Sequence, residues 1–282
     1  MFGANLRILN SGTKVQKYFD ICKKKCTFAE NLNVMTTISK AQVKLVRSLQ
    51  HKKFRDQTGL FVAEGEKCAE ELRKSFACAL VITPDNATRT EIEQMSSLRA
   101  PQGYIAVLHQ RKENLPRQAE GLVLALDGIQ DPGNLGTIIR TADWFGVRDI
   151  VCSANTADCY NPKVVQATMG SLARVHVHYT NLCEWLGEQQ CPIYGTLLEG
   201  DDMYTKLSAA HATQSNAVII MGNEGNGISL AVRKTITEAL RIPSYPANAE
   251  TGESLNVGIA TAIVLAEFRR PKKQRHAGNG NQ

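Results

Sequence analysis

The chain has 282 residues, of which 43% are hydrophobic and 21% are charged, and its formal net charge is +6. This length accommodates two domains, and the composition is typical of a soluble globular protein. No apolar run approaches the roughly 18 residues that a membrane span requires, so we expect no membrane anchor. Eight cysteines lack the paired spacing of zinc or thioredoxin-like sites, which predicts reduced thiols, no metal and a cytoplasmic protein.

The N-terminal part predicts an extension followed by a small α/β domain. Residues 1–37 carry several lysines but no apolar signal-peptide core, so we expect a disordered extension or an over-long start. Residues 38–50 have helical apolar spacing with a basic face that could meet RNA. Short apolar runs predict strands at 60–63, 79–82 and 104–108, with helices at 65–74 and 89–98. The predicted domain covers residues 38–108.

A polar segment at 109–120 predicts a linker, and a larger α/β domain follows at 121–268. Apolar runs predict buried strands at 122–126, 149–152, 174–178, 192–197, 217–221 and 239–242. Helices are expected between them at 134–146, 161–173, 181–188, 228–238 and 254–268. This alternation predicts a mostly parallel sheet with helices on both faces. The basic tail at 269–282 is expected to be disordered.

Ligands of such a sheet gather at the carboxyl ends of its strands, which directs attention to the loops after Leu126, Met221 and Ile242. In the first loop, Asn134 is the expected N-cap of a helix, and Arg140 points to another side of that helix. Composition alone favours a helix start with a surface arginine over a functional site in this loop.

The second loop, at 219–228, contains three glycines and one acid, Glu224, so its backbone can approach a flat ligand or an anion closely. Its spacing differs from the dinucleotide-binding and P-loop patterns. The third loop leads to Ser254 and Asn256 before an apolar helix, where both could be simple caps. Taken singly, none of the three loops identifies a function.

Together, these loops resemble the three motifs of the SpoU (TrmH-like) family of RNA ribose 2′-O-methyltransferases, in the SPOUT superfamily. The matching segments are DPGNLGTIIRTADWFGV, MGNEGNGIS and ESLNVGIATAI. The likeness covers residues 120–268. Residues 38–108 resemble the L30e-like substrate-binding domain that often precedes this catalytic domain, on the segments AQVKLVRSL and GLFVAEGEK.

The resemblance implies a trefoil knot in the C-terminal α/β domain, a homodimer that completes the site, and S-adenosylmethionine as methyl donor. The implied catalytic residues are Arg140, Asn134, Glu224, Ser254 and Asn256. The implied donor-binding residues are Thr196, Leu197, Met221, Gly222, Gly227, Ile242, Leu255 and Asn256. The family assigns Arg140 to activation of the hydroxyl, but a guanidinium loses its proton very reluctantly, so gripping a phosphate is easier chemistry. No metal is implied.

The N-terminal domain favours ribosomal RNA over transfer RNA as the substrate. The residues expected to bind RNA are Lys40, Lys44, Arg47, Lys52, Lys53 and Arg55. A non-catalytic RNA-binding protein of the same fold is the main alternative, and a nucleotide-binding oxidoreductase is a second.

Several other features are open. His176 and His178 alternate along a predicted strand, which favours a sheet face over a metal site. Trp144 and Phe145 are expected in the core or in a dimer contact. The bridge Ser244–Glu253 is longer than the family pattern, and Gly258 stands where a serine is common.

Overall fold

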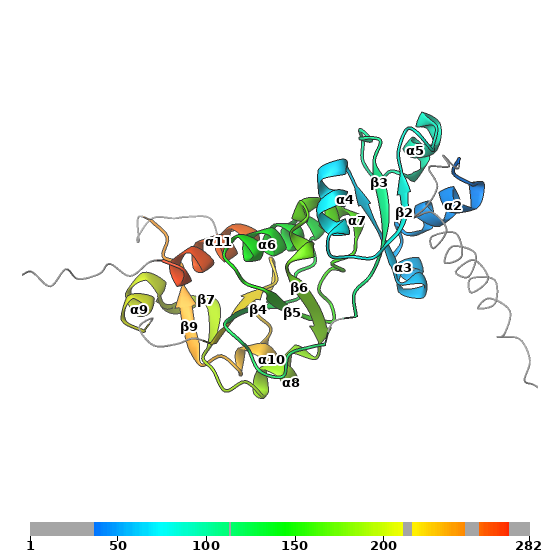
Figure 1. Cartoon of the computed structure of the whole chain (residues 1–282). Helices are drawn as coiled ribbons and strands as arrows, with labels where there is room; N and C mark the ends of the chain where they lie inside the picture. Colours follow the sequence, from blue (N-terminus) through cyan, green and yellow to red (C-terminus); the bar gives the residue numbers. More distant parts are fainter. Residues whose placement is uncertain (1–36, 113, 211–215, 246–253, 271–282) are drawn as a thin grey trace, which may run out of the picture. The chain divides into compact units, whose positions relative to one another are not determined.

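The computed structural model describes residues 37–112, 114–210, 216–245 and 254–270, which form two compact units (Figure 1). Unit 1 contains residues up to Lys112 together with Asp158–Ala173, and unit 2 contains the rest. The predicted extension at 1–36, residues 246–253 of the long bridge, and the tail from 271 lie outside the described residues. No helix in the described ranges is long and apolar enough to cross a membrane.

Unit 1 is built on a three-stranded antiparallel sheet in the order β1-β3-β2. Alternate residues of β1 face opposite sides, so Val62 joins a core with α2 and α5 while Phe61 packs on the other face. The elements are α2 (Lys40–Ser48), α3 (Lys52–Thr58), β1 (Leu60–Glu64), α4 (Glu66–Arg73), β2 (Cys78–Ile82), α5 (Arg89–Met95) and β3 (Ile105–His109). Capping boxes at Ser39 and Thr88 begin α2 and α5.

A segment from the middle of the chain completes unit 1. This segment, Asp158–Ala173, is called the strap; it contains α7 (Pro162–Thr168) and the short helix η2 (Ser171–Ala173). The ring of Tyr160 lies 4.7 Å from that of Phe61, centroid to centroid, and α7 packs on β1. The sequence pattern assigned the strap to the catalytic domain, because contacts between distant segments leave no local periodicity.

Unit 2 contains a six-stranded sheet in the order β6-β5-β4-β8-β7-β9, in which every adjacent pair is parallel. Its strands are β4 (Leu122–Asp127), β5 (Asp149–Ser153), β6 (His176–Thr180), β7 (Ile193–Asp202), β8 (Ala217–Gly222) and β9 (Glu238–Arg241). Its helices are α6 (Pro132–Trp144), α8 (Leu182–Gly187), α9 (Met203–Ala210), α10 (Leu230–Arg233) and α11 (Val257–Phe268).

Helices cover both faces of this sheet, as the sequence predicted. One face packs Val123 and Val218 against Trp185 of α8 and Val232 of α10. The other face carries α6 and α11, which pack on each other (Figure 1). The carboxyl ends of β4 and β8 are adjacent at the point where the strand order changes direction, which is where parallel sheets bind ligands.

Three helices differ from the prediction. Helix α3 was missed because its sequence, KKFRDQT, has no apolar periodicity; it ends at Gly59, which adopts the left-handed φ of 65°. Helix α9 was also missed. The helix expected at 228–238 is limited to Leu230–Arg233, since β9 already begins at Glu238.

Candidate active site at the carboxyl ends of the parallel strands

The strand β4 ends on a buried carboxylate, Asp127, that the sequence reasoning did not single out. Its Oδ2 accepts a hydrogen bond from the backbone N–H of Ser229 at 2.7 Å, and its Cα pairs in register with that of Gly222 in β8. A buried carboxylate needs such a donor. The acid at the end of the apolar run LVLALD was the available signal. Asp127 therefore joins the loop after β4 to the loop after β8.

Asn134 does not cap α6 as the sequence analysis expected. The N-cap is Asp131, whose Oδ1 accepts the backbone N–H of Asn134 at 2.8 Å, and Pro132 takes the first helical position, where its missing N–H costs nothing. The expectation was wrong because an aspartate followed by proline is an equally good helix start. Asn134 lies one turn inside, so its side chain is available to the site. Its Nδ2 donates to Oε1 of Glu224 at 2.9 Å.

The glycine loop after β8 folds back on itself and fixes the position of Glu224. The backbones of Asn223 and Gly227 exchange two hydrogen bonds of 2.9 Å, with Gly227 at the left-handed φ of 65°. A Cβ at Gly222 would lie 2.3 Å from the backbone nitrogen of Ile228, so only glycine permits this approach. The Asn223 side chain accepts from two loop amides and donates to the Gly128 carbonyl.

A chain of hydrogen bonds links one residue from each of the three loops. Besides the contact between Asn134 and Glu224, Nδ2 of Asn256 donates to Oδ1 of Asn134 at 2.9 Å. Oδ1 of Asn256 accepts the backbone N–H groups of Gly258 and Ile259, which makes Asn256 the N-cap of α11. Helix α11 thereby fixes the orientation of both amides. We call Glu224, Asn134 and Asn256 the amide relay.

Arg140 and Ser254 lie outside this relay. Both side chains are exposed, and within the described residues no hydrogen bond or ion pair joins either of them to the relay. Arg140 follows Asn134 by six residues along α6, which turns it roughly 240° around the helix axis. Of the five residues in the predicted catalytic set, the structure brings three together.

Thr196 and Leu197, two of the predicted donor-binding residues, lie at an irregularity in the pairing of β7 with β9. Thr196 and Asp201 both align with Leu240 of β9, so residues 197–200 leave the regular register and form a bulge in β7. Gly200 lies against the backbone of Leu240, because a Cβ at Gly200 would be 2.5 Å from the Leu240 carbonyl carbon. The Thr196 hydroxyl donates to the Ile220 carbonyl at 3.1 Å, which joins β7 to β8. Backbone groups at a bulge suit a flat ligand that is bound mainly through main-chain contacts, as the sequence analysis expected of the donor.

The other predicted donor-binding residues lie on or after the neighbouring strands and before α11. Met221 is buried at the end of β8, whereas Ile242 is half-buried after β9 and Leu255 is 52% exposed. The described residues thus offer backbone, thioether and aliphatic groups there, which fit an adenosine and a methionine moiety.

An ion pair that the sequence reasoning missed holds the glycine loop near the bulge in β7. Arg233 Nη1 donates to Oε1 of Glu199 at 2.6 Å, and its Nε donates to the carbonyl of Ile228 at 3.0 Å. Because both side chains are partly exposed, the pair contributes little stability, and its effect is to restrain two loops.

The basic residues predicted to bind RNA have different surroundings in unit 1. Lys40, Lys44, Arg47 and Lys53 are exposed. Lys52 pairs with Asp56 at 2.8 Å. Arg55 is only 1% exposed, so its prediction as an RNA contact is wrong. Its guanidinium binds the Leu49 and Gln50 carbonyls and Asp158 of the strap, because a buried cation requires such partners.

Two other expectations can be compared with the structure. His178 is buried in β6 with Nε2 2.9 Å from Oδ1 of Asp149, and among the described residues no cluster of metal ligands occurs. Trp144, at the end of α6, is 85% exposed, so it does not lie in the core; the other expected place, a dimer contact, stays a prediction.

Comparison with known proteins gives two family matches. Residues 121–266 match the SpoU rRNA Methylase family, and residues 40–102 match the MRM3-like substrate binding domain. The chain is 32% identical over 247 residues to the 23S rRNA (guanosine(2553)-2′-O)-methyltransferase RlmP of Bacillus subtilis, covering 81% of this chain and 96% of that protein. It is 34% identical over 153 residues to RlmB of Neisseria meningitidis, a 23S rRNA (guanosine-2′-O-)-methyltransferase, covering 54% of this chain and 59% of that protein.

Two solved structures are similar over most of the chain. An RNA methyltransferase of the TrmH family from Porphyromonas gingivalis has a TM-score of 0.74 and 37% identity, covering 83% of this chain and 99% of that chain. An AdoMet-bound rRNA methyltransferase from Sinorhizobium meliloti has a TM-score of 0.72 and 29% identity, covering 83% and 96% respectively.

Proposed function

Since the chain belongs to the SpoU rRNA methylase family, we propose that unit 2 transfers a methyl group from S-adenosylmethionine to a ribose 2′-hydroxyl of ribosomal RNA. The predicted family, reaction and donor are confirmed by the matches, since related proteins are named for this activity and one similar structure contains the donor. Ribosomal RNA is favoured over transfer RNA because RlmP and RlmB are named for 23S rRNA. The observation that carries the proposal is the amide relay, which joins the three motif loops.

We propose that the donor is held at the bulge in β7, by the backbone of residues 197–200 together with Met221, Gly222 and Leu255. The fit rests on the bulge in β7 and on the tight glycine loop. When bound, S-adenosylmethionine supplies a methyl group on a positively charged sulfur. Thr196, Gly227, Ile242 and Asn256 complete the proposed donor set.

In this proposal, the relay orients the ribose hydroxyl for in-line attack. Glu224 is the only anionic member, so its carboxylate can accept the hydrogen bond of the attacking hydroxyl and, with it, the proton. Asn134 donates to that carboxylate, and Asn256 fixes the orientation of Asn134, which gives the alignment such a displacement requires. Ser254, at the entrance of α11, remains a candidate contact for the ribose.

We propose that Arg140 binds the phosphate next to the target ribose. Its exposed position and the reluctance of guanidinium to lose a proton favour an orienting role over that of a base. Fork-shaped donors suit phosphate oxygens. Arg140 thus provides the most direct test of substrate positioning.

We further propose a homodimer, a trefoil knot in unit 2, and action in the cytoplasm. Support for the dimer is that Trp144 of α6 and Ile259 of α11 are exposed by 85% and 55%, on helices that pack together. The knot is a property of the family. The cytoplasm is supported by the free thiols of all six cysteines in the described ranges.

The decisive experiment measures methyl transfer from labelled S-adenosylmethionine to ribosomal and transfer RNA by the full chain. We expect Arg140→Ala to lower the rate by about 100-fold or more while calorimetry shows unchanged donor affinity. Arg148→Ala is the matched control, because Arg148 is another exposed arginine of unit 2. If the wild-type chain neither transfers methyl to any RNA nor binds the donor, the proposed function is wrong.

A further inference from the structure

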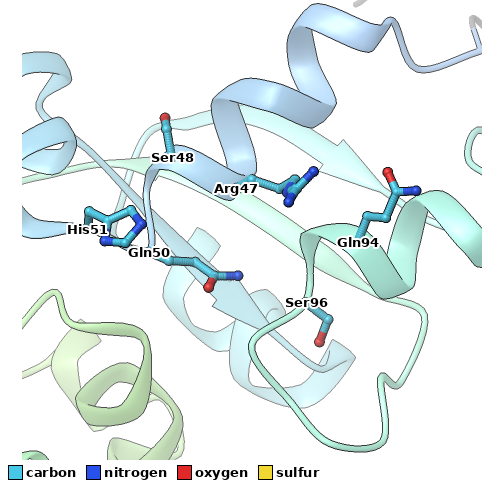
Figure 2. Close-up of a pocket in the computed structure, with 6 residues that line it drawn as sticks. All are labelled: Arg47, Ser48, Gln50, His51, Gln94 and Ser96. Carbon is cyan, nitrogen blue, oxygen red and sulfur yellow. The ribbon is translucent and has the colours of Figure 1, made fainter.

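Unit 1 contains a polar hollow between the end of α2 and the end of α5, with a cavity volume of about 350 Å³. Figure 2 shows Arg47 and Gln94 extending from the two helices toward the same space. Its lining residues are Arg47, Ser48, Gln50, His51, Gln94 and Ser96. All six are polar and none is acidic. We call this site the α2–α5 hollow.

Hydrogen bonds hold the walls of the α2–α5 hollow in place. Nε2 of Gln50 donates to the Met95 carbonyl at 3.2 Å, which joins one wall to the other. Buried Arg55 donates to the carbonyls of Leu49 and Gln50, so the turn that carries Gln50 is fixed from below. Ser96 donates to the carboxylate of buried Glu64. A site with fixed walls loses little freedom on binding.

The lining offers three kinds of contact. The Arg47 guanidinium is exposed and makes no hydrogen bond or ion pair with any other described residue. Gln94 provides an amide, which both donates and accepts. His51 adds an aromatic ring; Phe54, outside the lining, lies edge-on to it with ring centroids 6.4 Å apart. A cation, an amide and an aromatic ring match the phosphate, the base edge and the base face of a nucleotide.

We propose that the α2–α5 hollow binds one unstacked nucleotide of the RNA substrate. Arg47 would contact its phosphate, Gln94 the edge of its base, and the ring of His51 the face of its base. The cavity volume lies at the lower end of the roughly 300–1,000 Å³ range of small-ligand sites, which suits a single nucleotide. The absence of apolar lining residues disfavours an anchoring protein side chain. This inference rests on the proposed function, which makes RNA the substrate.

The kinetic test measures KM for a ribosomal RNA fragment and kcat for methyl transfer, using the full chain. We expect Arg47→Gln to raise KM by about 10-fold with kcat nearly unchanged, as for the loss of one charged contact. Gln94→Ala should raise KM less. Lys74→Gln is the control: Lys74 is an exposed cation of unit 1 at the end of α4, paired with Glu71, and its loss should change neither constant. Thermal unfolding checks that each variant is folded.

A second measurement is independent of catalysis. RNA carrying 4-thiouridine is cross-linked to the chain without donor, and the cross-linked peptides are mapped by mass spectrometry. We expect cross-links within residues 47–54 that 5′-mononucleotides suppress and inorganic phosphate does not. Unchanged KM together with no cross-link in these residues, or equal suppression by phosphate, would overturn the inference. Cross-links there without any methyl transfer would instead contradict the proposed enzyme.

Discussion

The side chain of Asn256 has two roles, and a different atom carries each of them. Its Oδ1 accepts the first backbone N–H groups of α11, whereas its Nδ2 donates to Asn134 within the amide relay. Capping contributes to stability, and the donated bond aligns Glu224 through Asn134. A single substitution can therefore remove the hydrogen bond that aligns Glu224 while the N-cap of α11 is kept.

We expect Asn256→Asp to fold as stably as the wild type and to lose about 10- to 100-fold in kcat/KM, because aspartate is an equally good cap but cannot donate to Asn134. Asn256→Ala should lose the activity and also about 1 kcal/mol of stability. Thermal unfolding and methyl-transfer rates measure both effects. Full activity in Asn256→Asp would show that the relay does not align the site.

Gly258 departs from the family pattern, where a serine is common, and the structure gives a physical reason. A Cβ at Gly258 would lie 3.0 Å from Cγ2 of Thr137 on α6 and 3.2 Å from Oδ1 of Asn256. The glycine thus lets α11 approach α6 while Thr137 keeps its methyl group.

At the scale of elements, the spacing of apolar residues predicted the helices and strands whose own sequence carries a clear apolar pattern. Strands β4, β5 and β8 of unit 2 are largely continuous apolar runs, and they were predicted to within one residue. Strand β7 was predicted at 192–197 but extends to Asp202, because its last four residues, Glu199–Asp202, carry no apolar side chain. Asn134, Glu224 and Asn256 were found through their motifs, although the pattern could not give the cap at Asp131. The bond of Asp127 and the packing of the strap within unit 1 were not predicted, because their partners are far away in the sequence.

The strap depends on the buried ion pair between Arg55 and Asp158, at 2.7 Å. We expect Arg55→Met to destabilise unit 1 by about 3 kcal/mol, because it leaves a carboxylate and two carbonyls without their donor. Lys52→Met, which breaks the exposed pair with Asp56, should cost at most about 1 kcal/mol. Urea unfolding measures both. If both substitutions lower the free energy of unfolding by the same small amount, the buried pair does not stabilise the strap.

At the scale of the whole molecule, stability should fall in alkaline solution through Cys68. Burial raises the pKa of the Cys68 thiol from 9.0 to about 11. The folded state therefore holds this proton more tightly than the unfolded state. Its contribution, about 2–3 kcal/mol, is complete below pH 9 and is lost as the pH rises toward 11.

Urea unfolding between pH 8 and 11 tests this expectation in the wild type and in Cys68→Ala. The difference between the two should shrink as the pH rises, because all other groups titrate alike in both proteins. A difference that is constant over this range would contradict a thiol held neutral by burial.

The strap also limits how the domains of this protein can be exchanged with those of a relative. Unit 1 is assembled from two stretches of chain, and Tyr160 and α7 pack directly on β1. In a chimaera that exchanges only the residues before Lys112, the strap would pack against a β1 strand from another protein. Exchanging unit 1 for the corresponding domain of a relative therefore requires exchanging Asp158–Ala173 as well, because unit 1 consists of two separate stretches of the chain.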